Sequence, residues 1–318
     1  MKGIGIIAMI LGHCPIPRLL NSFIFTWHMP LFFIISGFFF HPLKVVDSIK
    51  RNFRSLLIPY LVTIVILFLL YILFNDTIFT SITQAFESSI IGAGSRGLPN
   101  YQDYYVGALW FLQALFWCKF LYDVIYIYCS DLYRPIFILI ISSISTFIGG
   151  YLFIPTNLLQ GASALIFYEV GYQLYLKKIL FLNYNNCLLL FTSLVLVTVS
   201  LLSGSMSMVR CFYGFYPVNV LCAISLFILC YQFSALLNNN RTVSNILSYL
   251  GRISIVILCV HIIDLFYSFF PLLNDNILHL SGIQERLSRT IWRVLYAIVL
   301  SCVLVRIEVI SRLFRVAK

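Results

Sequence analysis

Long apolar runs separated by short polar segments extend along almost the whole chain. A helix that crosses a bilayer needs about 20 mostly apolar residues. On this basis the pattern predicts an all-α integral membrane protein, a bundle of about ten transmembrane helices. Their expected positions are residues 3–14, 19–40, 56–74, 105–128, 135–151, 162–176, 188–202, 217–237, 253–270 and 290–305. Residues 75–104, which contain Gly, Ser, Asn and Pro, are expected to form the longest loop, and Pro271 is expected to end the ninth helix.

The first apolar run, residues 3–14, is too short for an ordinary span. Either this helix is shielded by its neighbours, or the true start of the protein lies upstream of Met1. We favour the second interpretation. No cleavage pattern for a signal peptide follows the run, so the segment is expected to stay in the membrane.

Composition leads to the same class. Hydrophobic residues make up 61% of the 318 residues and charged residues 10%, whereas soluble domains have roughly 45–50% and about 25%. The net charge of +10 does not indicate nucleic-acid binding, because the Lys and Arg residues lie between apolar runs and not on a soluble basic module. With no internal repeat or low-complexity tract, residues 1–318 are expected to form a single membrane domain.

The distribution of positive charge predicts the orientation. Ten spans would place both termini on one side, and alternate loops on that side hold the excess of Lys and Arg, including Lys2 and the cluster at 44–54. By the positive-inside rule this side is cytoplasmic. The nine cysteines are scattered without CxxC or His/Cys ligand spacing, so we expect packing roles and no metal site.

Histidines within apolar segments are the first candidates for chemistry, since polar groups are costly in hydrocarbon. His13 could serve as a general base for a hydroxyl nucleophile or simply hydrogen-bond another helix. His28 precedes Pro30 and could satisfy the carbonyls freed by this proline, or line a site. His261 has Asp264 one turn later; the two could form a proton-handling dyad or satisfy one another in lipid.

Arginine pairs are the second group of candidates. Arg51 and Arg54, spaced three residues apart, could grip phosphate groups with two guanidinium forks. Positive-inside anchoring also explains both arginines, and on the residues alone it is favoured over phosphate binding. Arg286, Arg289 and Arg293 are expected to form an outward basic face. This face could contact an anionic acceptor, but an anchor for lipid phosphates is the favoured interpretation.

Two further side chains could serve a site. Trp110 has the position expected of an interfacial belt residue. Glu169 is an acid well inside an apolar helix and needs a partner or a water-filled cavity. Structural pairing and a site role are both open for Glu169.

Six stretches of the chain, in this order, resemble the acyltransferase 3 family of membrane acyltransferases, particularly its branch similar to fucose 4-O-acetylases. They are KGIGIIAMILGH ending at His13, FTWHMPLFFIISGF around His28, RNFRSLLIPY from Arg51, ALWFLQAL around Trp110, FYEVGYQL around Gly171 and LGRISIVILCVH ending at His261. The first two are quite specific, and the six stretches are distributed over most of the chain, from Lys2 to His261.

The resemblance implies an enzyme of roughly ten helices that transfers an acyl group, usually acetyl from cytoplasmic acetyl-CoA, to a hydroxyl of a sugar or cell-envelope polysaccharide. It implies His13 as the catalytic histidine and Arg51 and Arg54 as the pair that meets the donor. His28 becomes a site-lining residue, and Trp110, Glu169 and His261 are further substrate-binding candidates. The expected location is a bacterial inner (plasma) membrane, with acetyl-CoA as the donor, membrane lipid around the protein and no metal.

Two alternatives remain open. A transporter or flippase of a polysaccharide or lipid-linked substrate would also be polytopic with intramembrane His, Asp and Glu. An inactive, truncated acyltransferase is the other, since the family usually has an Arg and an Asp shortly before the KG of the first helix and this chain begins at Met1 without them.

Overall fold

Helices make up nearly all of the regular structure. A computed structural model of the chain describes residues 1–74, 81–98, 100–181, 186–204 and 206–316. It is 79% helical, and these ranges contain no β-strand apart from two isolated bridges between single residues. The predicted all-α class is confirmed, as expected for a chain whose backbone must satisfy its own hydrogen bonds in lipid.

Helix α2 (Arg18–Phe38) lies at the centre of the bundle. It packs against α1 (Lys2–Gly12), α9 (Leu165–Leu176), α10 (Asn186–Leu202) and α11 (Tyr216–Leu237). Its apolar residues point in several directions because the helix has neighbours on several sides, and Leu31, Phe33 and Ile34 are fully buried. The chain thus places the run that follows His13 in the core.

The crossing of α2 with α9 depends on two glycines. A Cβ atom on Gly37 would lie 1.9 Å from the carbonyl oxygen of Tyr168, and one on Gly171 would lie 2.0 Å from that of Ile34. No side chain fits at either point, so the two backbones touch directly. Small residues are common at helix contacts in membranes, where close packing replaces the hydrophobic effect as the driving force.

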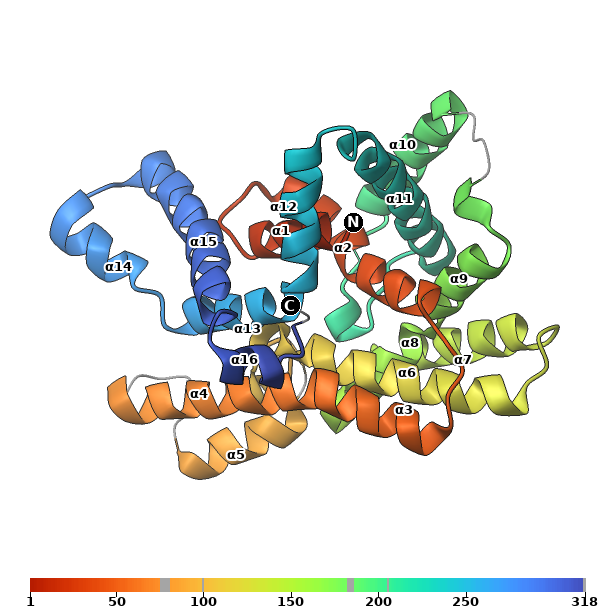
Figure 1. Ribbon diagram of the computed structural model, residues 1–318, viewed down its shortest axis with the longest axis horizontal. Helices are drawn as coiled ribbons and strands as arrows, with labels where there is room; N and C mark the ends of the chain where they lie inside the picture. Colours follow the sequence, from red (N-terminus) through yellow and green to blue (C-terminus); the bar gives the residue numbers. More distant parts are fainter. Residues whose placement is uncertain (75–80, 99, 182–185, 205, 317–318) are drawn as a thin grey trace.

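A long rod of helix runs along the lower edge of the bundle in Figure 1. It consists of α3 (Val45–Asn52), a π-helical turn (Phe53–Leu57) and α4 (Ile58–Phe74). Alongside it lies α6 (Trp110–Tyr128). The cytoplasmic cluster predicted at residues 44–54 therefore continues directly into an apolar helix.

The C-terminal third surrounds the outer side of α1. Helices α12 (Arg241–Arg252) and α13 (Ser254–Phe266) are bent by 71° at Ile253. Both contact α1, as does α15 (Gly282–Leu304). The remaining helices are α5 (Ile82–Ile91), α7 (Arg134–Gly149), α8 (Leu158–Ser163), α14 (Phe270–Leu273) and α16 (Glu308–Leu313).

Fewer helices than predicted are long enough to cross a membrane, so the bundle of about ten spans is not confirmed. Within the described residues five qualify by length and composition, and the bent pair α12–α13 would make a sixth. The five are Arg18–Phe38, Val45–Phe74, Gly107–Tyr128, Tyr216–Leu237 and Gly282–Leu304. Three others, α1, α7 and α10, are apolar but shorter, and the run predicted at 162–176 is interrupted at Ala164, between α8 and α9.

Two local expectations were wrong. The stretch 75–104, expected to be a loop, contains α5, which Ser81 caps by accepting a hydrogen bond from the Gln84 amide; residues 75–80 and 99 lie outside the described ranges. Pro271 does not end the ninth helix. That helix, α13, ends at Phe266, and Pro271 lies in the first turn of α14, where its missing N–H is not needed.

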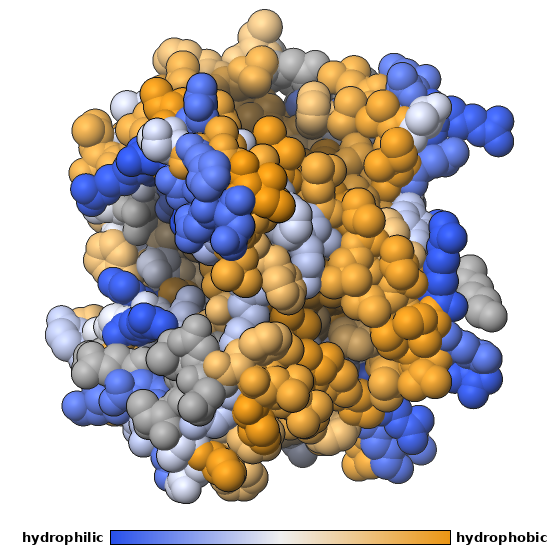
Figure 2. All heavy atoms as spheres, turned by 90° about the vertical axis from the view of Figure 1, so that its left-hand side faces the viewer, coloured by the Kyte–Doolittle hydropathy of each residue, from blue (hydrophilic) through white to orange (hydrophobic). Residues whose placement is uncertain are grey.

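Large apolar side chains cover much of the protein surface. On α15 they form a stripe at four-residue spacing, each more than half exposed: Ile283, Leu287, Ile291, Leu295, Val299 and Val303. Figure 2 shows apolar residues over much of the face that includes α15, with hydrophilic side chains gathered toward its two sides. Such a surface is stable against lipid and unfavourable in water, which supports the membrane assignment.

Candidate active site

His13 lies where α1 ends. The helix stops at Gly12, and His13 is its C-terminal cap. Its Nδ1 lies 2.8 Å from the carbonyl oxygen of Met9, one turn earlier. A carbonyl only accepts, so Nδ1 carries the proton and donates it, and Nε2 keeps its lone pair. The ring is thereby held in the tautomer that a general base requires.

Three histidines gather at this point. The ring centres of His13 and His261 lie 5.3 Å apart in an edge-to-face contact. The Phe25 ring contacts both His13 and His28, and its centre lies 5.7 Å from the His13 ring and 4.9 Å from the His28 ring. Helices α1, α2 and α13 each contribute one histidine, so residues distant in sequence converge on one place.

The imidazoles of His28 and His261 have unused hydrogen-bonding capacity. Both side chains are fully buried, and in the described part of the chain neither nitrogen of His261 nor Nε2 of His28 has a partner. Buried polar atoms are normally paired, so unpaired ones indicate a place for a ligand or water. The Nδ1 of His28 contacts the carbonyl of Ile24 at 2.8 Å. Pro30 has no N–H to donate to the carbonyl of Thr26, so the oxygen that it frees is that of Thr26 and not that of Ile24. The interpretation that His28 satisfies a freed carbonyl was therefore wrong.

Asp264 does not pair with His261, so it forms neither a proton-handling dyad with this histidine nor a pair in which the two satisfy one another. Its carboxylate is fully buried and accepts hydrogen bonds from Arg293 Nε and Trp292 Nε1, both at 3.2 Å, and from Ser268 Oγ at 3.1 Å. Arg293 was expected on an outward basic face, and this prediction was also wrong. Its side chain is mostly buried, where the buried carboxylate of Asp264 stabilises its positive charge. A second guanidinium nitrogen of Arg293 donates to the backbone carbonyl of His13.

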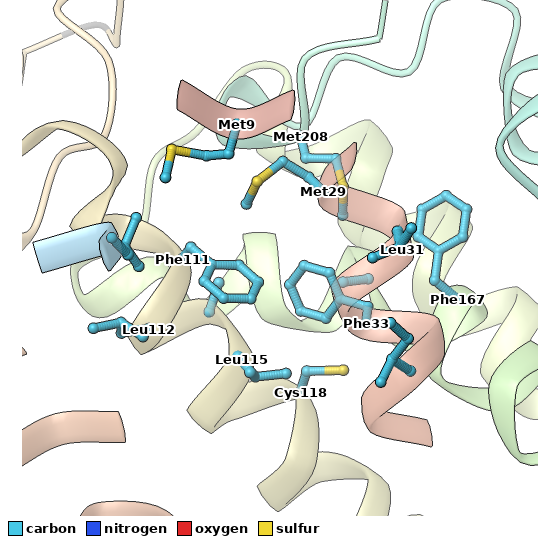
Figure 3. Close-up of a cluster of buried hydrophobic side chains, with 14 of the residues drawn as sticks. Met9, Met29, Leu31, Phe33, Phe111, Leu112, Leu115, Cys118, Phe167 and Met208 are labelled. Carbon is cyan, nitrogen blue, oxygen red and sulfur yellow. The ribbon is translucent and has the colours of Figure 1, made fainter. Parts of the chain in front are cut away.

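A narrow apolar cavity approaches His13 from the opposite end of α1. This inner cavity has a volume of about 90 Å³ and lies between α1, α2, α6 and α13. Figure 3 shows Met9 and Met29 facing Phe111 across this space. Its lining residues are Lys2, Ile6, Met9, Met29, Phe32, Ser36, Leu56, Ala108, Phe111, Leu112, Leu115, Ser254, Ile255 and Leu258. Met9 lies one turn from His13, and its carbonyl holds the imidazole.

A wider opening, the vestibule, adjoins the inner cavity. It has a volume of about 530 Å³ and shares Lys2, Ser254 and Ile255 with the inner cavity. Lys2 and Arg252, both exposed, line it together with apolar side chains such as Phe38 and Phe227. A basic mouth thus leads into an apolar passage.

A larger cavity than these two, about 990 Å³, lies beyond the other end of the site. Arg18, Leu19 and Ser22 of α2 line it, so we call it the Arg18 cavity. Because the vestibule is lined by Phe38 at the far end of the same helix, the length of α2, about 30 Å, separates the two openings. His13 and its neighbouring histidines lie between them.

The sequence profile of the acyltransferase 3 family, described as an acyltransferase domain, matches residues 1–306. The chain belongs to the acyltransferase 3 family. None of the curated proteins and none of the solved structures compared with the chain gives a match. The family and the apolar helices together make it a multi-pass membrane acyltransferase.

In this acyltransferase 3 protein, Arg51 and Arg54 lie in the helical rod at the edge of the inner cavity. Arg51 is in the last turn of α3 and Arg54 in the π-helical turn, and both are exposed. Neither lines the cavities, but Leu56, two residues after Arg54, lines the inner cavity. In the described residues no carboxylate lies within ion-pair distance of either arginine, so both guanidinium groups remain available to a ligand.

A buried polar network that sequence reasoning missed fixes this arginine segment onto α6. Ser48 donates to Asp123, Asn52 donates to Ser48 at 3.0 Å, and Lys119 donates to Asn52 at 3.3 Å. Ser48 and Asn52 lie one turn apart, as do Lys119 and Asp123. Each of the two segments has two polar residues four positions apart. This spacing was the signal in the sequence from which the network could have been predicted.

Trp110 is buried and does not form an interfacial belt. Only 5% of its surface is exposed, and its ring fills the space left by Gly94, whose Cβ would lie 2.3 Å from the indole. The next two residues of α6, Phe111 and Leu112, line the inner cavity. The structure therefore places Trp110 behind the cavity wall.

Glu169 belongs to a separate buried cluster. Its carboxylate accepts hydrogen bonds from Tyr122 and Gln173, each at 2.6 Å, and pairs with Arg134 at 3.4 Å. The Arg134 guanidinium also lies over the Tyr126 ring, 4.9 Å from its centre. These contacts account for the buried acid through structural pairing, and none of them joins it to the three histidines.

Proposed function

We propose that the protein is an O-acetyltransferase that moves an acetyl group from acetyl-CoA to a hydroxyl of a sugar or cell-envelope polysaccharide, with His13 as the general base. The observation that carries the proposal is the position of His13 between two openings of different chemistry. One is a basic vestibule that narrows into an apolar passage, and the other is a wide cavity whose lining includes Arg18 and Arg210. Two substrates that enter from opposite ends of α2 would meet at this imidazole.

The donor side suits an acyl-CoA. Its phosphates would bind at the basic mouth, near Lys2 and Arg252 and within reach of Arg51 and Arg54, because guanidinium forks bind phosphate oxygens in pairs. The uncharged pantetheine arm would lie in the vestibule and widen the narrow apolar inner cavity as it enters. The thioester would then arrive beside Met9 and Met29, one helical turn from His13.

The chemistry follows from the free lone pair on His13 Nε2. This nitrogen removes the proton of the acceptor hydroxyl as the oxygen attacks the thioester carbonyl. The C–S bond breaks when the tetrahedral intermediate collapses, the acetyl ester forms, and the thiolate of coenzyme A takes up the proton. A positioned base of this kind contributes about 10²- to 10⁴-fold in rate, and His28 and His261 would line the acceptor's approach with their unpaired nitrogens.

The proposed setting is a bacterial inner (plasma) membrane with both termini cytoplasmic. Acetyl-CoA is a cytoplasmic metabolite, so the vestibule would face the cytoplasm. Met1 and Lys2 line the vestibule, which puts the N-terminal end of α1 on the donor side, in agreement with the positive-inside rule.

The decisive experiment measures the O-acetyl content of cell-envelope glycans by NMR in a deletion strain. The strain is complemented with wild type, His13→Ala or His41→Ala, and membrane insertion is checked by immunoblotting. His41 is exposed and does not line the inner cavity, the vestibule or the Arg18 cavity, so it is the matched control. Acetyl groups restored by wild type and His41→Ala but not by His13→Ala support the proposal. Equal acetylation by all three would refute the role of His13, and export of glycan without acetylation would favour a transporter.

A further inference from the structure

The Arg18 cavity has the dimensions of a ligand site. Its volume of about 990 Å³ is at the upper end of the range of roughly 300–1,000 Å³ found for ligand pockets, so it can hold several sugar rings. Its walls come from the start of α2, the end of α7 and the loops on either side of residue 210. The residues that matter below are Arg18, Ser22, Gly149, Tyr151, Arg210 and Phe212.

Two arginines give the cavity a positive charge that no acid balances. Arg18 and Arg210 are exposed, and the cavity lining contains no Asp or Glu. Among the described residues neither arginine has a carboxylate within 4.0 Å. Both side chains therefore keep guanidinium N–H groups free for an anion.

Arg210 is also held in place. Its Nε donates to Ser95 Oγ at 3.1 Å, and a Cβ atom on Gly97 would lie 2.5 Å from its Nη2. The glycine therefore makes room for the guanidinium, and the serine fixes its orientation. A guanidinium held at one nitrogen still presents the others in a plane that matches a carboxylate or a phosphate.

The rest of the lining suits a carbohydrate. Tyr151 is 77% exposed and Phe212 51% exposed, so both rings offer faces on which the C–H side of a sugar can lie. Ser22, Ser207 and the glycines at 149, 150 and 204 leave hydroxyls and backbone groups near the ligand.

The cavity wall leads to the three histidines. Ser22 and Phe25 are three residues apart on α2 and so share a helix face. Phe25 contacts both His13 and His28. Asn21, beside Ser22, donates to the carbonyl of Gly12 at 2.5 Å. These contacts connect the wall of the cavity to the residues around His13.

We propose that the Arg18 cavity is the acceptor site and that it selects an anionic glycan, whose carboxylate or phosphate binds between Arg18 and Arg210. This inference rests on the proposed function and narrows the acceptor class. Acceptors with an acidic group should be preferred over neutral acceptors of the same size and linkage.

The test uses the full-length protein in lipid nanodiscs with a uronate-containing oligosaccharide and its carboxyl-reduced counterpart, which differ only in charge. A phosphate-bearing oligosaccharide and its dephosphorylated form provide the second pair and distinguish the two sources of the anion. Acetyl transfer from acetyl-CoA gives KM for each acceptor, and fluorescence anisotropy of labelled oligosaccharide gives Kd without any chemistry. The variants are Arg18→Gln, Arg210→Gln and, as control, Arg241→Gln at an exposed position outside the cavity lining.

Wild type and Arg241→Gln should bind the anionic member of at least one pair about tenfold or more tightly than the neutral member, as charge-assisted hydrogen bonds provide. Arg18→Gln and Arg210→Gln should each bring this ratio toward one. Equal affinity of wild type for both members of both pairs would overturn the inference, as would an undiminished ratio in both cavity variants. Charge-dependent binding without acetyl transfer would refute the proposed function but support the anionic binding site. Acetyl transfer without charge preference would support the proposed function but refute the anionic binding site.

Discussion

Arg293 donates a hydrogen bond to the backbone carbonyl of His13, 280 positions earlier in the chain. The same guanidinium pairs with the buried carboxylate of Asp264 on α13. Arg293 therefore joins α15 to the end of α1 and to the helix that carries His261. The position of the candidate base depends on this contact, since His13 lies beyond the last residue of its own helix.

We expect Arg293→Ala to be strongly destabilising, because it leaves Asp264 buried with no cation beside it. Removing one partner of a buried pair costs about 3–5 kcal/mol. Arg289→Ala, on the same helix one turn earlier, is the matched control. Its pair with Glu285 is at the surface, and such pairs contribute about 0–1 kcal/mol.

Thermal unfolding of both variants in the same detergent measures this difference. A Tm for Arg293→Ala that equals that of Arg289→Ala would show that the Asp264 pair is not needed. Arg293→Lys adds a second reading, because lysine keeps the charge but cannot contact Asp264 and the His13 carbonyl with two separate nitrogens. It should restore part of the stability and less of the acetyl transfer.

We expect Gly37→Ala and Gly171→Ala to separate α2 from α9. Each added methyl would meet a backbone oxygen at about 2 Å, and a backbone cannot rotate away as a side chain can. Overpacking of this kind costs about 1–3 kcal/mol. Gly150→Ala is the control, since its nearest contact would be an ordinary 3.4 Å. A lowered Tm for the control as large as that for Gly37→Ala would contradict the explanation.

The apolar pattern predicted some helices well and others poorly, for a physical reason. The span expected at 19–40 is α2 at Arg18–Phe38, because one long uncharged run needs only its own backbone hydrogen bonds to form a helix. Short helices such as α5 and α8 depend on caps and neighbours, and the apolar pattern does not show these. The predicted number of spans is not confirmed where apolar runs form helices shorter than the usual bilayer crossing, as in α1, α7 and α10.

The candidate site, too, could be predicted from the sequence only in part. His13 and His261 were identified as single polar residues in apolar runs, and the structure brings their rings together. The partner of Asp264 was misassigned because sequence proximity favoured His261, three residues away, whereas the actual partner is Arg293, 29 residues later. The network of Ser48, Asn52, Lys119 and Asp123 was missed for a similar reason, since it joins residues up to 75 positions apart.

A bulky side chain at Ser254 should block the passage of the donor. Ser254 lines both the vestibule and the inner cavity, at the point where the wider space narrows. We expect Ser254→Phe to raise KM for acetyl-CoA by about tenfold or more, since the pantetheine arm would have to displace the ring. Ser248→Phe is the control, because Ser248 lines only the wider vestibule. Steady-state kinetics in nanodiscs would contradict the proposed route if both variants kept the wild-type KM.

Arg51→Ala and Arg54→Ala should weaken binding of the donor through its phosphates. Each lost charge-assisted contact should raise KM for acetyl-CoA by about tenfold, with little change in kcat. Acetyl-pantetheine has the same thioester without the nucleotide phosphates, so its kinetics should not respond to either substitution. Lys50→Ala, an exposed neighbour on α3, tests whether positive charge in general is sufficient. An equal loss of activity with both donors would show that the two arginines support the helix packing and do not bind the phosphates.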